Sequence, residues 1–85
     1  DGVIRGFIEM NGTQLSKIYV DSFFQSQGVG DALIRYATEE FGADNLWALE
    51  KNKRAISFYQ NHGFQVTGRK RLEENTTEYL VKLER

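Results

Sequence analysis

The chain has 85 residues with a mass of 9.8 kDa, and 40% of them are apolar and 13% aromatic, which is enough for a single domain with one core. Its 11 basic and 12 acidic residues give a net charge of −1, without the basic excess of nucleic-acid-binding proteins. It has no cysteine, which excludes disulfides, a thiolate nucleophile and a cysteine-based zinc site. No apolar run approaches the ~18 residues of a membrane span and no signal peptide is visible, so we expect a cytoplasmic protein.

The chain begins with a predicted β-hairpin. The run from Val3 to Met10 is apolar on both faces and predicts a central strand. Asn11-Gly12 follows, a strong hairpin signal because both central residues of a type I′ turn need a positive φ. A second strand from Leu15 to Val20 is therefore expected to pair antiparallel with the first.

A first helix is predicted after the hairpin. Helical periodicity begins at Val29 and runs to Phe41. Gly42 then takes the position after the C-cap, where a residue without Cβ enters the left-handed conformation most easily. Between these ends the periodicity continues through Ala32, Leu33, Tyr36, Ala37 and Glu40.

The second half of the chain predicts three strands and one helix. A short strand spans Leu46 to Leu49, and a helix capped by Asn52 closes at Gly63, with Ala55, Ile56 and Tyr59 facing inward. Strands from Phe64 to Gly68 and from Thr77 to Leu83 then flank the polar turn Glu73–Thr76.

The element order β-β-α-β-α-β-β predicts an α/β (or α+β) fold with a mixed, mainly antiparallel sheet. The helix between the second and third strands makes a crossover connection, so these two strands are expected to be parallel and the crossover right-handed.

The segment before the first helix is the strongest candidate for a binding site. It reads Gln25-Ser26-Gln27-Gly28-Val29-Gly30-Asp31 and joins a strand to a helix N-terminus, where backbone N–H groups and the helix dipole favour an anion such as phosphate. The third glycine of a dinucleotide-binding turn and the lysine of a P-loop are both missing. Ordinary turn chemistry is the alternative interpretation of these glycines.

Asn52 and Tyr59 form a second candidate pair. Seven residues of α-helix return to nearly the same face, about 10.5 Å further along the axis, so an amide and a phenol would line one side of a groove. The alternative is that Asn52 is an ordinary N-cap and Tyr59 an ordinary half-buried aromatic.

Together, the loop Gln25–Gly30, the spacing Asn52-x6-Tyr59 and the pair Gly63-Phe64 resemble the GNAT acetyltransferase superfamily. The resemblance extends over nearly the whole chain, and in this family the Gln-x-x-Gly-x-Gly loop binds the pyrophosphate of acetyl-coenzyme A. It implies an acyl-CoA N-acyltransferase fold and acetyl transfer to a primary amine of a small molecule or peptide by direct attack, with no metal.

The resemblance also implies roles for individual residues. The strand edge at Ile18, Tyr19 and Val20 would pair with the pantetheine arm, and the Val20 N–H would polarise the thioester carbonyl. The pyrophosphate would bind at Ser26–Asp31 and the pantetheine would contact Asn52. Tyr59 would protonate the departing coenzyme A thiolate, because a phenol with a pKa near ~10 is protonated at pH 7.

The sequence departs from the family in three respects. Ser22 stands where a proline is usual, and Trp47 stands where some members have a glutamate that acts as base. No base can be named, although the carboxylates near the strands are Glu9, Asp21 and Glu50. Family members also carry an N-terminal β-α-α-β portion without a counterpart here, so we expect residues 1–85 to be one GNAT-like domain that lacks it, and a fragment of a longer chain.

A different class of function stays open, namely a non-catalytic coenzyme A-binding or interaction module completed by another chain. An exposed edge of the first strand favours pairing with a second copy, so we also expect a homodimer. Among the remaining polar residues, His62 is expected to cap the second helix, and Arg69-Lys70-Arg71 to face Glu73-Glu74 in a solvated hairpin.

Overall fold

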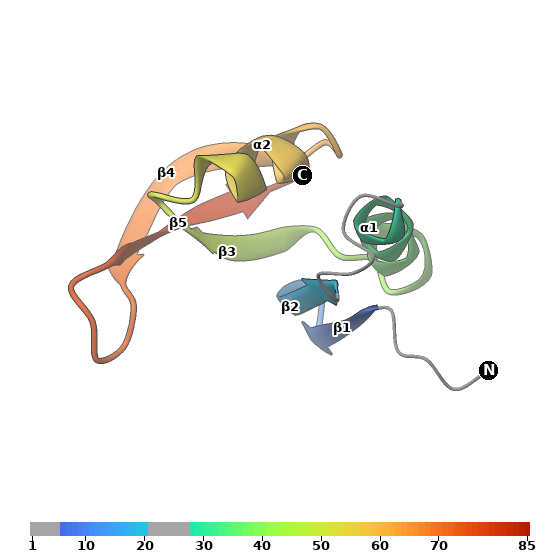
Figure 1. Cartoon of the computed structure of the whole chain (residues 1–85), viewed down its shortest axis with the longest axis horizontal. Coiled ribbons are helices and arrows are strands. Elements are labelled where there is room, and N and C mark those ends of the chain that lie inside the picture. The colour runs from blue at the N-terminus through green and yellow to red at the C-terminus, as the bar shows by residue number, and fades with distance from the viewer. Residues whose placement is uncertain (1–5, 21–27) are drawn as a thin grey trace. The chain divides into compact units, whose positions relative to one another are not determined.

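The computed structural model describes residues 6–20 and 28–85 and shows five strands and two helices within them (Figure 1). In chain order they are β1 (Gly6–Asn11), β2 (Gln14–Val20), α1 (Val29–Glu40), β3 (Asn45–Leu49), α2 (Lys53–Gln60), β4 (Gln65–Leu72) and β5 (Tyr79–Glu84). The predicted α+β class and the order β-β-α-β-α-β-β are therefore confirmed. The chain divides into two compact units, Asp1–Ala43 and Asp44–Arg85. Neither described helix is long and apolar enough to cross a bilayer.

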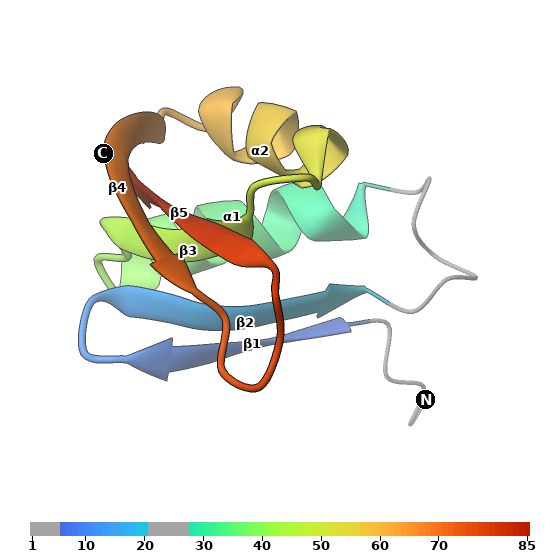
Figure 2. The same cartoon turned by 90° about the vertical axis from the view of Figure 1, so that its left-hand side faces the viewer.

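The first unit is built on the hairpin of β1 and β2 (Figure 2). The two strands pair antiparallel with Asn11 opposite Gln14, so Gly12 and Thr13 are the central turn residues. Only Gly12 has a positive φ there, at 63°. The turn is thus shifted by one residue from the predicted Asn11-Gly12 centre, because glycine takes the first central position, as in a type II′ turn.

The strand β1 differs from its prediction in burial. Its side chains alternate between half-buried and exposed, and Phe7 is 44% exposed. The edge away from β2 has no strand partner among residues 6–20 and 28–85. β1 is therefore an edge strand with one covered face, and the predicted central strand is wrong; Val3 to Arg5, its predicted start, lie outside the described residues.

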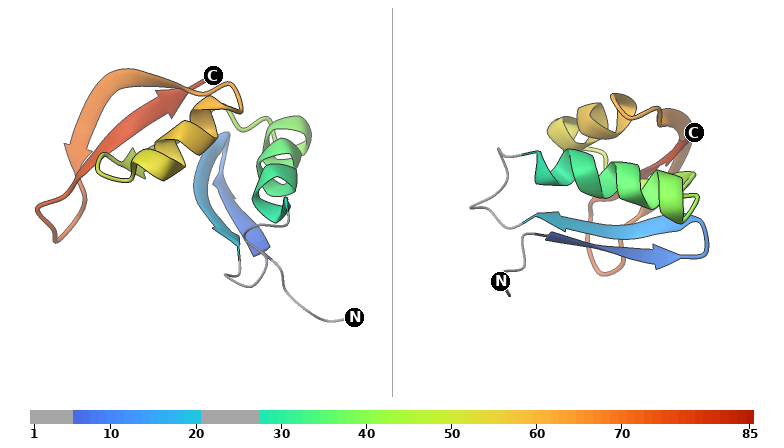
Figure 3. Two further views of the ribbon diagram at one scale, coloured as in Figure 1. Left: turned by 45° about the horizontal axis from the view of Figure 1, so that its top comes forward. Right: turned by 90° about the vertical axis from the view of Figure 1, so that its right-hand side faces the viewer.

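Helix α1 packs along the β1–β2 hairpin (Figure 3). Its fully buried side chains are Ile34 and Ala37, whereas Ala32 is exposed and Tyr36 is 50% exposed. Not every position of the predicted periodicity is buried, because Tyr36 packs against Phe41 at the surface, with ring centres 5.3 Å apart. The predicted C-terminal end is confirmed: Gly42 has a φ of 64° just after Phe41.

The second unit is an antiparallel sheet in the order β3-β5-β4, with α2 lying over it (Figure 3). Leu46 pairs with Leu83 and Ala48 with Val81, so these four buried side chains share one face. Phe64 is fully buried directly before β4. The core of this unit therefore forms between that face of the sheet and α2.

Two predicted boundaries in this unit change. α2 ends at Gln60, and Gly63 follows in a turn with a φ of 92°. β4 continues past Gly68 to Leu72, because Gly68, with a φ of 88°, lies within an irregularity of the strand rather than at its end. The parallel pairing predicted for the second and third strands would join the two units and stays a prediction.

Candidate functional site

The candidate phosphate site lies at the start of α1. Gly28 is the N-cap residue, with a φ of 77° and a ψ of 7°, and it makes no side-chain capping hydrogen bond. Gly28 O accepts from Ala32 N at 3.0 Å, which begins the helical ladder. A Cβ at Gly28 would meet no atom within 4 Å. A side chain at Gly28 would therefore have space, whereas Gln25, Ser26 and Gln27 lie outside the described residues.

The residues that follow Gly28 were all predicted to contact the pyrophosphate. Val29 and Gly30 form the first turn of α1 and are half-buried. Asp31 brings a carboxylate into this first turn, where it would repel a phosphate, but it pairs with Arg35 one turn on at 3.7 Å. The Arg35 guanidinium offsets part of the negative charge of Asp31. The backbone N–H groups at the start of α1 are therefore compatible with a bound anion.

The predicted pantetheine strand is the C-terminal half of β2. Ile18, Tyr19 and Val20 lie opposite Ile8, Phe7 and Gly6 of β1. Ile18 is half-buried, and the exposed Tyr19 ring stacks on Phe7 with centres 5.3 Å apart. One edge of β2 is therefore taken by β1, so a ligand that adds to β2 must use the other edge.

Asn52 is the N-cap of α2, and its Oδ1 accepts from Ala55 N at 3.1 Å. This is the ordinary capping role that the sequence left open as the alternative. An amide oxygen only accepts, so any hydrogen bond that Asn52 donates to a ligand comes from Nδ2, while Oδ1 keeps a second lone pair beside the bond from Ala55 N.

Tyr59 lies two turns further along α2 and is half-buried. Its ring packs edge-on against Phe58 and Phe64, with centres 5.4 Å and 6.1 Å away. Burial raises the pKa of the Tyr59 phenol above its ordinary value of about 10. The group is therefore fully protonated at neutral pH, as a proton donor must be.

The Tyr59 hydroxyl makes no hydrogen bond within the described residues. No buried side-chain nitrogen or oxygen in this part of the structure lacks a partner, so the hydroxyl reaches solvent. A phenol that is packed on its ring faces and open at its tip can donate its proton to a ligand without first breaking a protein hydrogen bond.

Of the three candidate bases, Glu50 is the one in the same unit as Tyr59. Glu50 forms an ion pair with Lys70 at 2.7 Å, and the hydrogen bond from Lys70 lowers the pKa of the Glu50 carboxyl. A lowered pKa makes Glu50 a weaker base. Glu9 is exposed on β1, and Asp21, like Ser22, lies outside the described residues.

Two other expectations are corrected. His62 lies beyond the end of α2, where its ring packs on Phe58 with centres 4.9 Å apart; it is not in the last helical turn. The side chains of Arg69, Lys70 and Arg71 do not face the Glu73-Glu74 pair, because Arg69 pairs with Glu84, Lys70 pairs with Glu50 and Arg71 lies over Trp47.

The arrangement of three cations around Trp47 was not predicted from the sequence. Arg71, Lys82 and Arg69 place their charged groups 4.4, 5.0 and 6.0 Å from the centre of the Trp47 ring. The three side chains come from two different strands, and only the register of β4 and β5 brings them together. Within residues 6–20 and 28–85 no group of His, Cys, Asp or Glu side chains could hold a metal ion.

Comparison with known proteins identifies the family. The chain matches the acetyltransferase (GNAT) domain family over residues 1–66, and it belongs to that family. It is 29% identical over 69 residues to the peptidyl-lysine N-acetyltransferase YjaB of Salmonella typhimurium. It is 34% identical over 67 residues to the peptidyl-lysine N-acetyltransferase YiaC of Escherichia coli.

The fold is also that of the family. The solution structure of apo-form YjaB from Escherichia coli matches with a TM-score of 0.80 at 27% identity, over 93% of this chain and 54% of that one. The matched regions are 81% of this chain and 48% of Salmonella YjaB, and 78% of this chain and 46% of YiaC. The chain thus spans about half the length of the curated relatives that it matches.

Proposed function

We propose that this chain binds acetyl-coenzyme A and transfers the acetyl group to a primary amine. The observation that carries the proposal is Tyr59, a phenol held by packing, kept protonated by burial and open at its hydroxyl. Simple binding of a coenzyme needs no proton donor, so Tyr59 favours an enzyme over a non-catalytic coenzyme A-binding module.

The proposed contacts with the coenzyme are described for each unit by itself. In the first unit, the backbone N–H groups at the start of α1 would bind the pyrophosphate. The edge of β2 that is not paired with β1 would pair with the pantetheine arm. In the second unit, Asn52 Nδ2 would donate to a pantetheine carbonyl. These are contacts of backbone and amide groups, which suit a long ligand with alternating carbonyls and amides.

The proposed mechanism is direct attack. A neutral amine nitrogen forms a bond to the acetyl carbon, and the Val20 N–H stabilises the negative charge that develops on the carbonyl oxygen. The carbonyl then re-forms as the carbon–sulfur bond breaks, and the Tyr59 hydroxyl gives its proton to the departing thiolate. The new amide nitrogen releases its surplus proton to solvent, and the Tyr59 phenolate regains a proton from solvent. Because the chain has no cysteine, a cysteine acyl-enzyme is excluded.

The acceptor that we propose is the lysine side chain of a peptide or protein. Both curated relatives reported above are named as peptidyl-lysine N-acetyltransferases. A lysine amine has a pKa near ~10 and must lose its proton before it can attack. Glu50 is tied to Lys70, so we propose that solvent takes this proton. The cytoplasmic location and the homodimer stay predictions.

The test is turnover of acetyl-coenzyme A with lysine-containing peptides. A chain without cysteine allows a thiol reagent to report released coenzyme A alone. We expect thiol release that depends on the peptide, and loss of the signal when the peptide lysine is acetylated beforehand. Coenzyme A binding by calorimetry without any turnover would support the non-catalytic module, and the absence of both would contradict the proposal.

A further inference from the structure

One face of the β3–β5–β4 sheet carries a cluster of cations around a single indole ring. Trp47 on β3 lies directly opposite Lys82 on β5, and Arg69 and Arg71 reach the same ring from β4. We call Trp47, Arg69, Arg71 and Lys82 the Trp47 cluster. All three charged groups lie within 6.0 Å of the ring centre, so they are held about a Debye length or less from one another.

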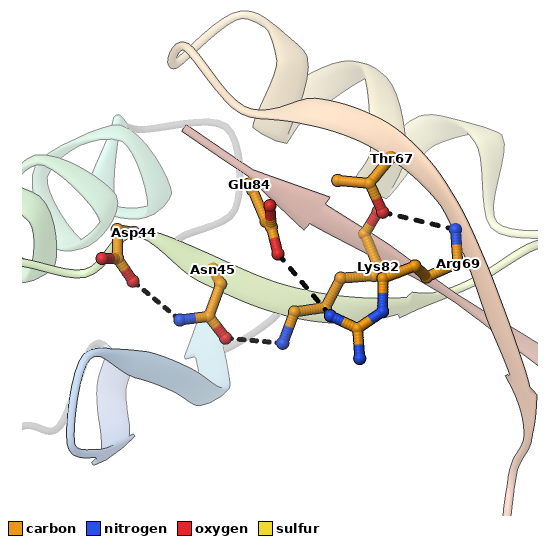
Figure 4. Close-up of polar contacts among 6 residues, drawn as sticks. All are labelled: Asp44, Asn45, Thr67, Arg69, Lys82 and Glu84. Atoms are coloured by element: carbon orange, nitrogen blue, oxygen red, sulfur yellow. Dashed lines mark hydrogen bonds and ion pairs between the residues drawn. The ribbon is translucent and has the colours of Figure 1, made fainter.

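The backbone of β4 builds this arrangement. Between the pairs Val66–Leu83 and Lys70–Val81, the three residues Thr67, Gly68 and Arg69 stand opposite Lys82 alone. Thr67 Oγ1 stabilises the irregularity, because it donates to Lys82 O at 3.2 Å and accepts from Arg69 N at 3.3 Å. The extra residues bring Arg69 level with Lys82 (Figure 4), which a regular strand would not do.

The charges of the cluster are only partly balanced. Lys82 is 8% exposed and donates to Asn45 Oδ1 at 2.7 Å, a neutral partner whose own amide donates to Asp44 at 2.7 Å (Figure 4). Arg69 has a carboxylate partner, Glu84, at 3.9 Å, while its side chain is 67% exposed. Arg71 is exposed, and no carboxylate in the described residues pairs with it. An anionic ligand would relieve the remaining repulsion.

We propose that the Trp47 cluster binds an extended acidic segment of a partner protein. Arg69 and Arg71 project to the same side of β4, and alternate residues of an extended chain are about 6.6 Å apart. The carboxylates of alternate residues in an extended peptide have this same spacing, so a peptide lying along β4 can pair two glutamates with the two guanidinium groups. The exposed part of the indole would contact the stem of an intervening side chain.

The charge pattern favours an acidic peptide over a nucleic acid. Glu84 and Glu50 lie among the basic side chains, beside Arg69 and Lys70, and the whole chain has a net charge of −1. A continuous phosphate backbone would meet these carboxylates, whereas a peptide places its charges only at alternate residues. The irregularity at Thr67–Arg69 also interrupts the outer edge of β4, which disfavours simple addition of a strand.

The test uses the full chain and a fluorescent peptide of alternating glutamate and threonine, blocked at both ends so that it carries no amine. Trp47 is the single tryptophan of the chain, so its emission reports binding at the cluster itself. We expect saturable binding seen both by anisotropy and by Trp47 emission, and weakening when NaCl is raised from about 0.05 M to about 0.3 M. Binding unaffected by salt, or without a change in Trp47 emission, would overturn the proposal.

Matched variants locate the site. Arg71→Glu should reduce the affinity by about tenfold or more, and Arg71→Lys should retain most of it. The control is Lys17→Glu, the same change of charge at an exposed residue of β2, which should alter the affinity by less than about twofold. An equal loss in both glutamate variants would overturn the proposal, as would tight binding of the glutamine version of the peptide or tighter binding of single-stranded DNA. No residue of the proposed acetyl-coenzyme A site is changed, so failure here leaves the proposed function standing.

Discussion

The two helices of this chain begin in opposite ways. α1 starts at Gly28, which is in the left-handed conformation and has no side chain that could cap the helix. α2 starts at Asn52, whose Oδ1 accepts from Ala55 N. A capped N-terminus has used one of its donors, whereas an uncapped one keeps them for a ligand. In the proposed site, the backbone at the start of α1 would bind the anion, and α2 would contribute two side chains, the Asn52 amide and the Tyr59 phenol.

The largest expected effect comes from closing the start of α1. Gly28→Val places a β-branched residue at a φ of 77°, where L-residues are strained by about 1–2 kcal/mol or more, and it shields the first N–H groups. We expect coenzyme A binding to fall by on the order of a thousandfold, as measured by calorimetry.

The control for Gly28→Val is Gly12→Val in the β1–β2 turn. Gly12 has a φ of 63°, and a Cβ there also meets no atom within 4 Å, so the backbone strain is similar. Both variants should lose similar stability in thermal unfolding, while Gly12→Val keeps its affinity for coenzyme A. If a folded Gly28→Val protein kept its affinity for coenzyme A, the phosphate would not bind at the start of α1.

Tyr59→Phe tests the chemistry assigned to α2. Loss of a general acid lowers turnover by roughly 10²-fold or more, and coenzyme A affinity should stay the same. Because the hydroxyl makes no hydrogen bond within the described residues, the free energy of unfolding should change by less than about 0.5 kcal/mol. Tyr36→Phe on the exposed side of α1 is the control, and thiol release is the measurement. Wild-type turnover in Tyr59→Phe would rule out this residue as the proton donor.

Asn52 allows the capping role and the ligand role to be separated. Asn52→Ala removes both and should destabilise the protein by about 1 kcal/mol. Asn52→Asp keeps an oxygen for Ala55 N, and thus the helix, but has no Nδ2 to donate. Both variants should bind coenzyme A about tenfold more weakly, whereas only Asn52→Ala should unfold at lower denaturant concentration. If Asn52→Asp binds as tightly as wild type, Asn52 serves the helix alone.

Local signals made much of this fold predictable. Gly42 and Asn52 each mark the end or start of a helix through the chemistry of a single residue. Asn52 and Tyr59 belong to one helix, so their spacing of seven residues was enough to predict that they lie on the same side of it. By contrast, Gly68 has the sequence signature of a strand end, and its position within β4 depends on pairing with Lys82, which no local pattern reveals. The periodicity of α1 located the helix but not its buried side chains, because Tyr36 packs on Phe41 outside the core.

The same reasoning explains what could be found of the site. The glycine loop and Tyr59 belong to continuous motifs, so the sequence indicated them. The Lys70–Glu50 pair and the Trp47 cluster join residues from different strands, and they require the register of β3, β4 and β5. Charge alone suggested that Arg69-Lys70-Arg71 would face Glu73-Glu74. In the strand β4, however, successive side chains point to opposite faces, and these three contact Glu84, Glu50 and Trp47 instead.

The burial of Tyr59 predicts a change of stability at high pH. The phenol has a raised pKa in the folded protein, so above pH ~10 the unfolded chain releases this proton while the folded chain keeps it. The free energy of unfolding should therefore fall as the pH rises from about 10 through the folded-state pKa. Urea unfolding at several alkaline pH values should show a smaller fall in Tyr59→Phe than in wild type. Parallel curves for the two proteins would contradict the assigned burial.

The smallest effect is expected at Glu50, just before the start of α2. Its carboxylate pairs with Lys70 at 2.7 Å, and this hydrogen bond lowers the pKa of Glu50. The stabilisation by this pair is therefore complete above the ordinary carboxyl pKa near ~4.3 and is lost as the pH falls through the lowered pKa. Glu50→Gln should leave turnover at neutral pH within about twofold of wild type, because a carboxylate held by an ammonium group is a poor base. In urea unfolding, the free energy of unfolding of Glu50→Gln should fall slightly less steeply at acidic pH than that of wild type. Glu9→Gln on β1 is the matched control. A large loss of turnover in Glu50→Gln alone would make Glu50 the missing base, and α2 would then be preceded by a catalytic carboxylate as well as carrying the acid.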